Sequence, residues 1–429
     1  MIALDPVVGE LGGVVEHFWE KVVDDAQQRC SQISRDLSWP VAACQHRLEE
    51  PCSGIDVAAF RDVHVDDLAV LVDRSVHVPP HTSHPDVGFV DEPAIIDTVP
   101  ARPSSTVVCQ DRSMSGYDVI GDIHGHADKL IGLLREMGYE QRSGAWRHAE
   151  RTAVFVGDLI DRGPQQRESI EIPRAMVEAG SAHMVLGNHE FNAIAYAQWN
   201  EERSDYSRSR LGKSGEKHLD QHAAFIDQIG LDTPGHRDAI AWFRTLPLWL
   251  DLDGLRVVHA CWNDAEIDRL RPLVNEFGGV TDEIIIDGTT KGHATYRAIE
   301  TIVKGPEIDL GGLVYLDKGG HRRNKARRRW WDESARTLRD IAEIPTGTEN
   351  PEGGLFAPLP ETPALDAIEH AYAGDVPVIV GHYWKSGTPA VLGPKAACVD
   401  YSAGKGGPLV AYQWSGETEL VDAHFVSFG

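Results

Sequence analysis

Three short polar runs contain side chains suited to holding metal ions. They occupy residues 121–125 (GDIHG), 157–163 (GDLIDRG) and 187–190 (GNHE). Each run follows an apolar segment typical of a buried strand and precedes a segment with helical spacing. Three strands would therefore bring Asp, His and Asn to one edge of a sheet, the edge at which open α/β sheets bind ligands. Carboxylate, imidazole and amide groups together suit a pair of hard or borderline divalent ions.

These runs resemble the motifs of the calcineurin-like metallophosphoesterases, and within that family the phosphoprotein-phosphatase branch. The branch carries GDxHG, GDxxDRG and GNHE in this order, followed by two histidines that His259 and His382 match here. The closing segment, 398–409, is similar to that of bacterial symmetrical diadenosine tetraphosphatases, although it lacks their threonine after Asp400. The resemblance, which includes bacterial Ser/Thr phosphatases, extends from residue 117 to the C-terminus.

The resemblance implies a cofactor of two divalent metal ions and assigns a ligand to each motif position. The expected ligands are Asp122, His124, Asp158, Asn188, His259 and His382. Asp158 would bridge the ions, the first two residues would complete one site, and the last three would complete the other. Manganese is the expected metal, with iron, zinc or magnesium as alternatives. Such a pair lowers the pKa of a bridging water, so the resemblance implies direct attack by a metal-bridging hydroxide.

Three further motif residues would act on the substrate. His189 is expected to protonate the leaving oxygen, with Asp161 orienting its ring, since a carboxylate fixes the tautomer and raises the basicity of imidazole. Arg162 offers a planar fork to phosphate oxygens. The family also carries a second phosphate-binding arginine between the two downstream histidines. The candidates for it are Arg297, Arg322 and Arg323.

The residues after the downstream histidines leave the substrate open. His259 is followed by Ala-Cys-Trp and His382 by Tyr-Trp, where protein phosphatases carry glycines and Thr-Pro. The expected activity is hydrolysis of a phosphomonoester, on a small molecule, nucleotide or protein. The alternative is a nucleotide polyphosphate hydrolase of the symmetrical diadenosine tetraphosphatase type. A non-catalytic scaffold is disfavoured because every expected ligand is present.

The intervening sequence predicts the elements that position these residues. Helical spacing predicts helices over 126–137 and 165–179, so the early strands should be parallel with right-handed crossovers. Helices are also expected over 218–229 and 238–245, as parts of a cap, and over most of 284–304. The resemblance implies an α/β (α+β) fold class, a metallophosphoesterase β-sandwich flanked by helices with a helical cap insertion.

Composition restricts the partners. The net charge of −25 opposes a general nucleic-acid or anionic-membrane surface, because polyanions bind to cationic footprints. The basic run 318–329 could still bind or process an RNA end, although such a run is more often a solvated face. No apolar run reaches the ~18 residues of a membrane span, no secretory signal is visible, and the six cysteines are scattered. A cytoplasmic location is therefore predicted.

Residues 1–115 differ from the rest of the chain. They contain one lysine, and six prolines between positions 79 and 103 interrupt any periodicity. They are predicted to form an N-terminal extension that is poorly ordered or partly helical. The extension contains none of the candidate site residues and is predicted to be dispensable, with residues 116–429 forming the catalytic domain.

Overall fold

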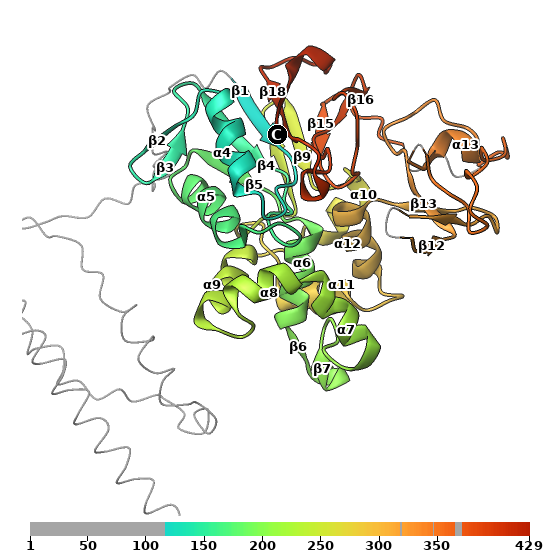
Figure 1. The fold of residues 1–429 in the computed structure, drawn as a ribbon, viewed down its shortest axis with the longest axis horizontal. Coiled ribbons are helices and arrows are strands. Elements are labelled where there is room, and N and C mark those ends of the chain that lie inside the picture. Colours follow the sequence, from blue (N-terminus) through green and yellow to red (C-terminus); the bar gives the residue numbers. More distant parts are fainter. Residues whose placement is uncertain (1–115, 318–319, 346, 365–370) are drawn as a thin grey trace, which may run out of the picture. The chain divides into compact units, whose positions relative to one another are not determined.

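Two five-stranded sheets form the centre of the described chain (Figure 1). The computed structural model describes residues 116–317, 320–345, 347–364 and 371–429. The first sheet has the order β19 (Phe425–Phe428), β18 (Leu409–Trp414), β1 (Gly116–Ile120), β4 (Arg151–Phe155), β5 (Ala182–Met184). The second has the order β16 (Val391–Gly393), β17 (Ala396–Cys398), β15 (Val378–Val380), β9 (Leu255–Val258), β8 (Trp249–Leu252).

Parallel pairing brings the ends of the motif-bearing strands together. β4 lies parallel to both β1 and β5, whereas β18 runs antiparallel to β1. In the second sheet, β15 lies parallel to both β9 and β17. The predicted parallel arrangement of the early strands is confirmed, and the polar runs follow at their carboxyl ends.

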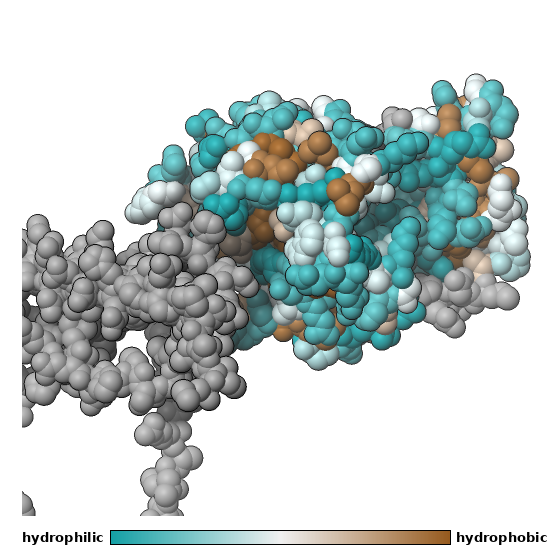
Figure 2. Space-filling view, turned by 90° about the horizontal axis from the view of Figure 1, so that it is seen from below, coloured by the Kyte–Doolittle hydropathy of each residue, from teal (hydrophilic) through white to brown (hydrophobic). Residues whose placement is uncertain are grey.

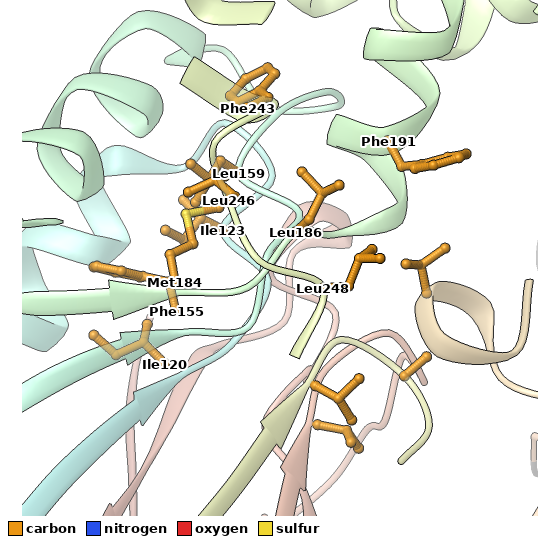
Figure 3. Packing of buried hydrophobic residues seen from close by; sticks show 14 of the residues in the cluster. Ile120, Ile123, Phe155, Leu159, Met184, Leu186, Phe191, Phe243, Leu246 and Leu248 are labelled. Carbon is orange, nitrogen blue, oxygen red and sulfur yellow. The ribbon is translucent and has the colours of Figure 1, made fainter. Parts of the chain in front are cut away.

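The two faces of each sheet pack in different cores, because successive side chains of a strand point to opposite faces. Val119 of β1, Val257 of β9 and Ile379 of β15 belong to one apolar cluster with members from both sheets. Ile120 and Phe155 belong to a second cluster, which includes helical residues, and they lie on the same side of neighbouring strands in Figure 3. The predicted β-sandwich flanked by helices is therefore confirmed.

The crossover helices match the sequence expectation closely. α4 (Ala127–Glu136) occupies the segment predicted as 126–137, and α5 (Gln166–Glu178) the segment predicted as 165–179. α4 contacts β18 and β19, and α5 contacts β5. Both helices thus pack on the first sheet, on the side that carries the helical cluster.

A helical cap follows α6 (Asn188–Ala197) and lies below the sheets in Figure 1. It consists of β6 (Trp199–Asn200), β7 (Asp205–Tyr206), α7 (Gly212–Gln221), α8 (Ala223–Ile229) and α9 (Pro234–Phe243). α9 begins four residues before the expected position 238. Thr233 accepts the N–H of His236, and Pro234 occupies the first turn, both of which favour an earlier start.

Three helices pack together after the second sheet's β9: α12 (Ala294–Lys304) contacts both α10 (Asp264–Leu270) and α11 (Asp282–Gly288), and α11 also contacts α6. The helix expected over most of 284–304 is two helices. Gly292 lies between them with φ +92°, a left-handed conformation that an α-helix does not contain.

The basic run forms strands within an insertion between α12 and β15. β12 (Arg322–Arg323) pairs with β11 (Tyr315–Leu316), and β13 (Lys325–Arg328) lies between β10 (Glu307–Asp309) and β14 (Ala342–Glu343). α13 (Leu338–Ile341) completes the insertion. Arg322 and Arg323 are exposed, whereas Arg328 is only 4% exposed. The expectation of a solvated face is therefore wrong for Arg328.

Residues 1–115, the predicted N-terminal extension, lie outside the described residues, as do 318–319 of the basic run. Within the described part of the chain, no helix combines the length and hydropathy that crossing a membrane requires. The face seen in Figure 2 is mostly hydrophilic, with hydrophobic residues in small groups.

Candidate metal centre and active site

Backbone hydrogen bonds join the loops that follow β1 and β4. The N–H groups of Ile123 and His124 donate to the carbonyl of Asp158 at 3.1 and 2.9 Å, and the N–H of Gly125 donates to Leu159 at 2.8 Å. These bonds bring the first two polar runs together. The imidazole of His124 consequently lies beside the carboxylate of Asp158.

Asp158 is common to two groups of potential metal ligands. One group contains His124, Asp158 and His189, the other Asp158, His259 and His382, and the ligand atoms within each group lie within 4.8 Å of one another. Oδ2 of Asp158 lies 3.6 Å from Nε2 of His124, whereas Oδ1 lies 3.4 Å from Nε2 of His259. The two oxygens thus face different histidines, as a bridging ligand would.

The remaining expected ligands lie around the second group. Oδ1 of Asn188 lies 2.7 Å from Nδ1 of His382 and 3.1 Å from Nε2 of His259. Asp122 accepts the N–H of His382 at 3.2 Å. The structure therefore brings all six expected ligands into one region at the carboxyl ends of the strands.

The histidines have the tautomer and orientation that metal ligation requires. Nδ1 of His124 lies 2.8 Å from the carbonyl of Ile160, and Nδ1 of His259 lies 2.7 Å from that of Val156. A backbone carbonyl can only accept, so each Nδ1 carries a proton, which leaves Nε2, on the side of Asp158, as the atom that could bind a metal ion. Nε2 of His124 is buried and has no hydrogen-bond partner among the described residues.

Buried negative charge also fits a pair of cations. Asp122, Asp158, Asp161, Glu190 and Asp400 are all at most 1% exposed, and buried carboxylates need compensation. Burial, followed by the charge of Asp400, raises the pKa of Asp122 well above its usual value. These residues fit a dinuclear metal centre, whose ions would supply that compensation.

Strained backbone is concentrated at this region. Among the described residues, ten that are not glycine have positive φ, and six of them lie here: His124 (+46°), Asp158 (+53°), Asp161 (+73°), Arg162 (+69°), His382 (+71°) and Trp384 (+47°). Each such residue costs of the order of 1–3 kcal/mol. The surrounding hydrogen bonds therefore maintain conformations that the chain would not adopt alone, which is typical of functional sites.

His189, Asp161 and Arg162 form a connected set beside Asp158. Nδ1 of His189 lies 2.5 Å from Oδ2 of Asp161, while Nε2 lies 3.5 Å from Nη2 of Arg162 and 3.9 Å from Oδ2 of Asp158. Burial alone would lower the pKa of His189, but Asp158 and Asp161 raise it. The arrangement favours a protonated imidazole with Nε2 facing the candidate centre.

The three expected substrate arginines interact elsewhere, away from the two ligand groups. Arg297 of α12 pairs with Glu266 at 3.0 Å, Arg323 pairs with Asp317 at 2.7 Å, and Arg322 is exposed on β12. Arg327 pairs with Glu307 at 3.0 Å, and only its charge reaches the second ligand group. Burial lowers the pKa of His382 well below its usual value, and the charge of Arg327 contributes to this shift.

Sequence reasoning missed four residues at this site. Nδ1 of His222, in the cap, contacts Asp161 at 2.9 Å. Asp400 accepts the N–H groups of Trp384 and Ser402 at 2.8 and 2.9 Å. The ring of Trp384 lies 4.6 Å from the guanidinium of Arg162 and 4.2 Å from Nζ of Lys405. None of the four belongs to the three runs; Trp384 follows His382, and Asp400 and Lys405 lie in the closing segment, but no role was predicted for any of them.

Glu190, the last residue of the third polar run, has a structural role at this site. Its carboxylate accepts the N–H groups of Asp158 at 2.8 Å and Leu159 at 2.7 Å. These bonds fix the loop after β4 against α6. Asp158 is thereby positioned by the residue that ends the third polar run.

The sequence profile of the calcineurin-like phosphoesterases matches residues 117–386. The chain belongs to this family. The asymmetrical bis(5'-nucleosyl)-tetraphosphatase PrpE of Bacillus velezensis is 32% identical over 220 residues, covering 47% of this chain and 84% of the relative. The symmetrical bis(5'-nucleosyl)-tetraphosphatase of Aromatoleum aromaticum is 34% identical over 144 residues, 33% of this chain and 42% of the relative.

The solved structures that are similar to this chain include a cold-active protein tyrosine phosphatase. It is 15% identical to this chain, with a TM-score of 0.39, over 73% of this chain and 78% of that one. Family membership makes the chain a hydrolase of a metal-dependent phosphoesterase family. The predicted resemblance is confirmed, and the histidine and aspartate groups described above could bind the metal.

Proposed function

We propose that this protein hydrolyses dinucleoside polyphosphates at a centre of two divalent metal ions. The observation that supports the two-ion centre most directly is the position of Asp158, whose two carboxylate oxygens face different ligand groups. When bound, such a pair of ions lowers the pKa of a water and withdraws charge from phosphoryl oxygens. Manganese is the first ion to test, and the residues proposed to hold the pair are Asp122, His124, Asp158, Asn188, His259 and His382.

His189 is proposed to give a proton to the leaving oxygen. Because its Nδ1–H donates to Asp161, the exchangeable proton is carried at Nε2. The hydrogen bond to Asp161 and the position of Nε2 beside Asp158 support the role of a general acid. Arg162, which lies beside Nε2, is proposed to hold phosphate oxygens and keep the leaving group within reach.

A pair of cations beside this region supports a polyphosphate substrate. Arg162 and Lys405 both lie against the ring of Trp384, at 4.6 and 4.2 Å from its centroid. The loop of Lys405 packs closely on the site, since a Cβ at Gly404 would approach His124 to 2.8 Å and Arg162 to 2.9 Å. Two cations suit neighbouring negatively charged phosphates better than the single phosphate of a monoester.

Relatives with the same chemistry support this substrate class. PrpE of Bacillus velezensis, of which the match covers 84%, has a name that specifies asymmetrical cleavage of a bis(5'-nucleosyl) tetraphosphate. We propose the same unequal cleavage here, giving a nucleoside triphosphate and a nucleoside monophosphate. A phosphomonoester, including one on a protein, is the second candidate. Arg162 and His189 lie in contact, so the two could act on a single phosphoryl group and its leaving oxygen.

The test is a substrate panel on metal-depleted protein reconstituted with manganese, magnesium or no ion. The panel contains diadenosine tetraphosphate, para-nitrophenyl phosphate, a phosphopeptide and 5'-triphosphate RNA. We expect the highest kcat/KM for diadenosine tetraphosphate with manganese, and chromatography should show ATP and AMP rather than ADP alone. A higher kcat/KM for the phosphopeptide would favour the second candidate.

Lys405→Met tests the proposed role of the second cation. The variant should lose about tenfold in kcat/KM for the tetraphosphate, the size of one charge-assisted hydrogen bond, and keep its rate on para-nitrophenyl phosphate. Arg297→Met is a matched control, because Arg297 lies on the surface of α12 and pairs with Glu266 of α10. Equal losses of Lys405→Met on both substrates would contradict a polyphosphate-specific role.

A further inference from the structure

Asp161 binds two histidines through one oxygen. Its Oδ2 lies 2.5 Å from Nδ1 of His189 and 2.9 Å from Nδ1 of His222. The aspartate and His222 are at most 1% exposed, and His189 is 7% exposed. Family motifs account for His189 and Asp161, whereas nothing in the three polar runs accounts for His222.

Both imidazoles donate to an ionised carboxylate. Burial alone would raise the pKa of Asp161, but the charge of His222 and the hydrogen bonds of both rings lower it to about 2. An ionised carboxylate only accepts, so Nδ1 carries the proton in both histidines. The rings of His189 and His222 stand nearly perpendicular, at 89° with centroids 6.5 Å apart, and so approach the shared oxygen from different directions.

The two histidines limit how the carboxylate can rotate. Oδ1 of Asp161 is buried and has no hydrogen-bond partner among the described residues. The orientation of the carboxylate therefore depends on what Oδ2 binds. With His189 alone, the pair could rotate together, whereas a second donor from a separate element fixes the direction of Oδ2.

His222 is itself firmly placed by the cap. It lies between α7 and α8, where its N–H donates to Leu219 at 3.0 Å and its carbonyl accepts from Ile226 at 2.9 Å. Its ring lies 6.0 Å from that of Tyr196. A ring fixed in this way can act as a reference point for Asp161.

α8 also braces the loop that follows Asp161. Gln228, near the end of α8, accepts the N–H of Gln166 at 2.9 Å and donates to the carbonyl of Pro164 at 2.6 Å. Gln166 in turn accepts the N–H of Asp161 at 2.7 Å. The cap therefore contacts this loop at both ends of one helix, with His222 as its contact to the carboxylate.

We propose that His222 is a positioning residue for the general acid, acting through Asp161 on His189. The cap thereby takes part in the reaction without touching the substrate. The inference rests on the proposed role of His189 as the acid. It predicts that losing the His222 donor misdirects the proton without disturbing metal or substrate binding.

The experiment compares His222→Leu, which removes the donor, with His222→Asn, whose amide can replace Nδ1–H. His236→Asn is the matched control, because His236 is a buried cap histidine in contact with the ring of Phe225. The substrates are aryl phosphates whose leaving groups span a wide range of pKa. Metal content, KM and Tm are measured for every variant.

We expect His222→Leu to lower kcat about tenfold on the poorest leaving groups, a fraction of the ~10²–10⁴-fold that acid catalysis contributes. On para-nitrophenyl phosphate the loss should stay within about twofold, because that leaving group needs little protonation. His222→Asn should recover most of the loss, and His236→Asn should show none. A loss independent of the leaving group, or reduced metal content, would overturn the inference.

A double-mutant cycle separates this inference from the proposed function. In a His189→Asn background, His222→Leu should cause no further loss of kcat, because the residue that it positions is gone. A full additional loss would show a role independent of His189. If His189→Asn itself shows no dependence on the leaving group, the proposed acid is wrong. If the loss of kcat depends on the leaving group for His189→Asn but not for His222→Leu, His189 is the acid and only the proposed role of His222 is wrong.

Discussion

At the scale of single residues, Asp158 is the centre of the proposed chemistry. Its oxygens face His124 and His259, its backbone has φ +53°, and its N–H is held by Glu190. Strain at a residue whose side chain faces two ligand groups is favourable only where a bound ligand or neighbouring bonds compensate for it. A substitution at this residue therefore gives the most direct test of the centre.

Asp158→Asn should nearly abolish turnover and reduce metal content. Asparagine has the same size but lacks the charge that a residue shared by two ions must supply. Loss of an outer-shell partner alone costs ~10–100-fold in metal affinity or activity, so we expect more than about 100-fold here. Metal analysis and kcat/KM provide the measurement, with exposed Asp251→Asn as control. Two bound ions with normal turnover would contradict the bridging role.

His189→Asn should lower kcat while leaving metal content unchanged. As a general acid it would contribute ~10²–10⁴-fold, mostly on poor leaving groups. The measurement is kcat across the aryl phosphate series, together with bound metal per protein. His189 also belongs to a group of potential metal ligands with His124 and Asp158. If it binds a metal ion instead of acting as the acid, the variant should contain less metal.

Residues of the site could be predicted from the sequence where strand, turn and ligand are adjacent. Asp122, Asp158 and Asn188 each come within four residues of the end of a strand, so the local pattern identified them. His222 lies 61 residues from Asp161, and only the packing of the cap brings the two together. The cations of the basic run could not be told apart in the sequence, because their burial depends on the pairing of β13 with its neighbouring strands.

At the scale of elements, one carboxylate joins the insertion to the loop that carries His382. Glu343 of β14 contacts Nζ of Lys385 at 2.5 Å and Nε of Arg329 at 2.6 Å. Lys385 lies three residues after His382, and its N–H donates to Asp400 at 2.9 Å. The insertion is therefore fastened to the proposed site through an ion pair.

Glu343→Gln should lower the free energy of unfolding by about 1–2 kcal/mol at neutral pH, because hydrogen bonds to a charged acceptor are lost. Burial alone would raise the pKa of Glu343, but Lys385 and Arg329 lower it below its usual 4.5. A depressed pKa stabilises the fold above pH 4.5, and this contribution disappears as the pH falls through the folded-state value.

Thermal unfolding as a function of pH measures this contribution. The Tm difference between the parent protein and Glu343→Gln should be constant above about pH 5.5 and shrink below pH 4.5, where the parent carboxylate becomes protonated. Glu352→Gln, in an exposed turn of the same insertion, should show no such dependence. A difference that persists unchanged to low pH would mean that packing, rather than charge, explains the loss.

The sequence predicted elements best where one period persists over three turns. α4 and α5 were located within a residue or two, because apolar positions recur at helical spacing. The prediction for the basic run failed for Arg328 because β13 alternates more exposed and buried positions over only four residues, too few for the period to be recognised. β13 pairs with β10 on one side and with β14 on the other. Arg328 is buried in this small sheet, and no local pattern in the sequence encodes that pairing.

At the scale of the whole molecule, the net charge is −25, so binding of an anionic substrate depends on the cations that lie beside the buried carboxylates of the proposed site. Arg162 and Lys405, which lie against Trp384, would attract an anionic substrate within a chain whose net charge repels polyanions. The second cation of the proposed polyphosphate site should therefore matter more at low salt. Raising ionic strength should lower kcat/KM for a tetraphosphate more than for a monoester, and equal dependence would contradict such steering.

The last prediction concerns residues 1–115, which we propose to be dispensable. Both sheets and every proposed site residue lie within 116–429, and β1 begins at Gly116. A chain that starts at Met114 keeps β1, which pairs with β18 and β4. We therefore expect unchanged metal content and kcat/KM, and a Tm within a few degrees. A chain that starts at Ala127 is the control, because it lacks β1 and Asp122 and should not fold. Aggregation of the Met114 form, or a much lower Tm, would show that the N-terminal residues contribute to folding of the catalytic domain.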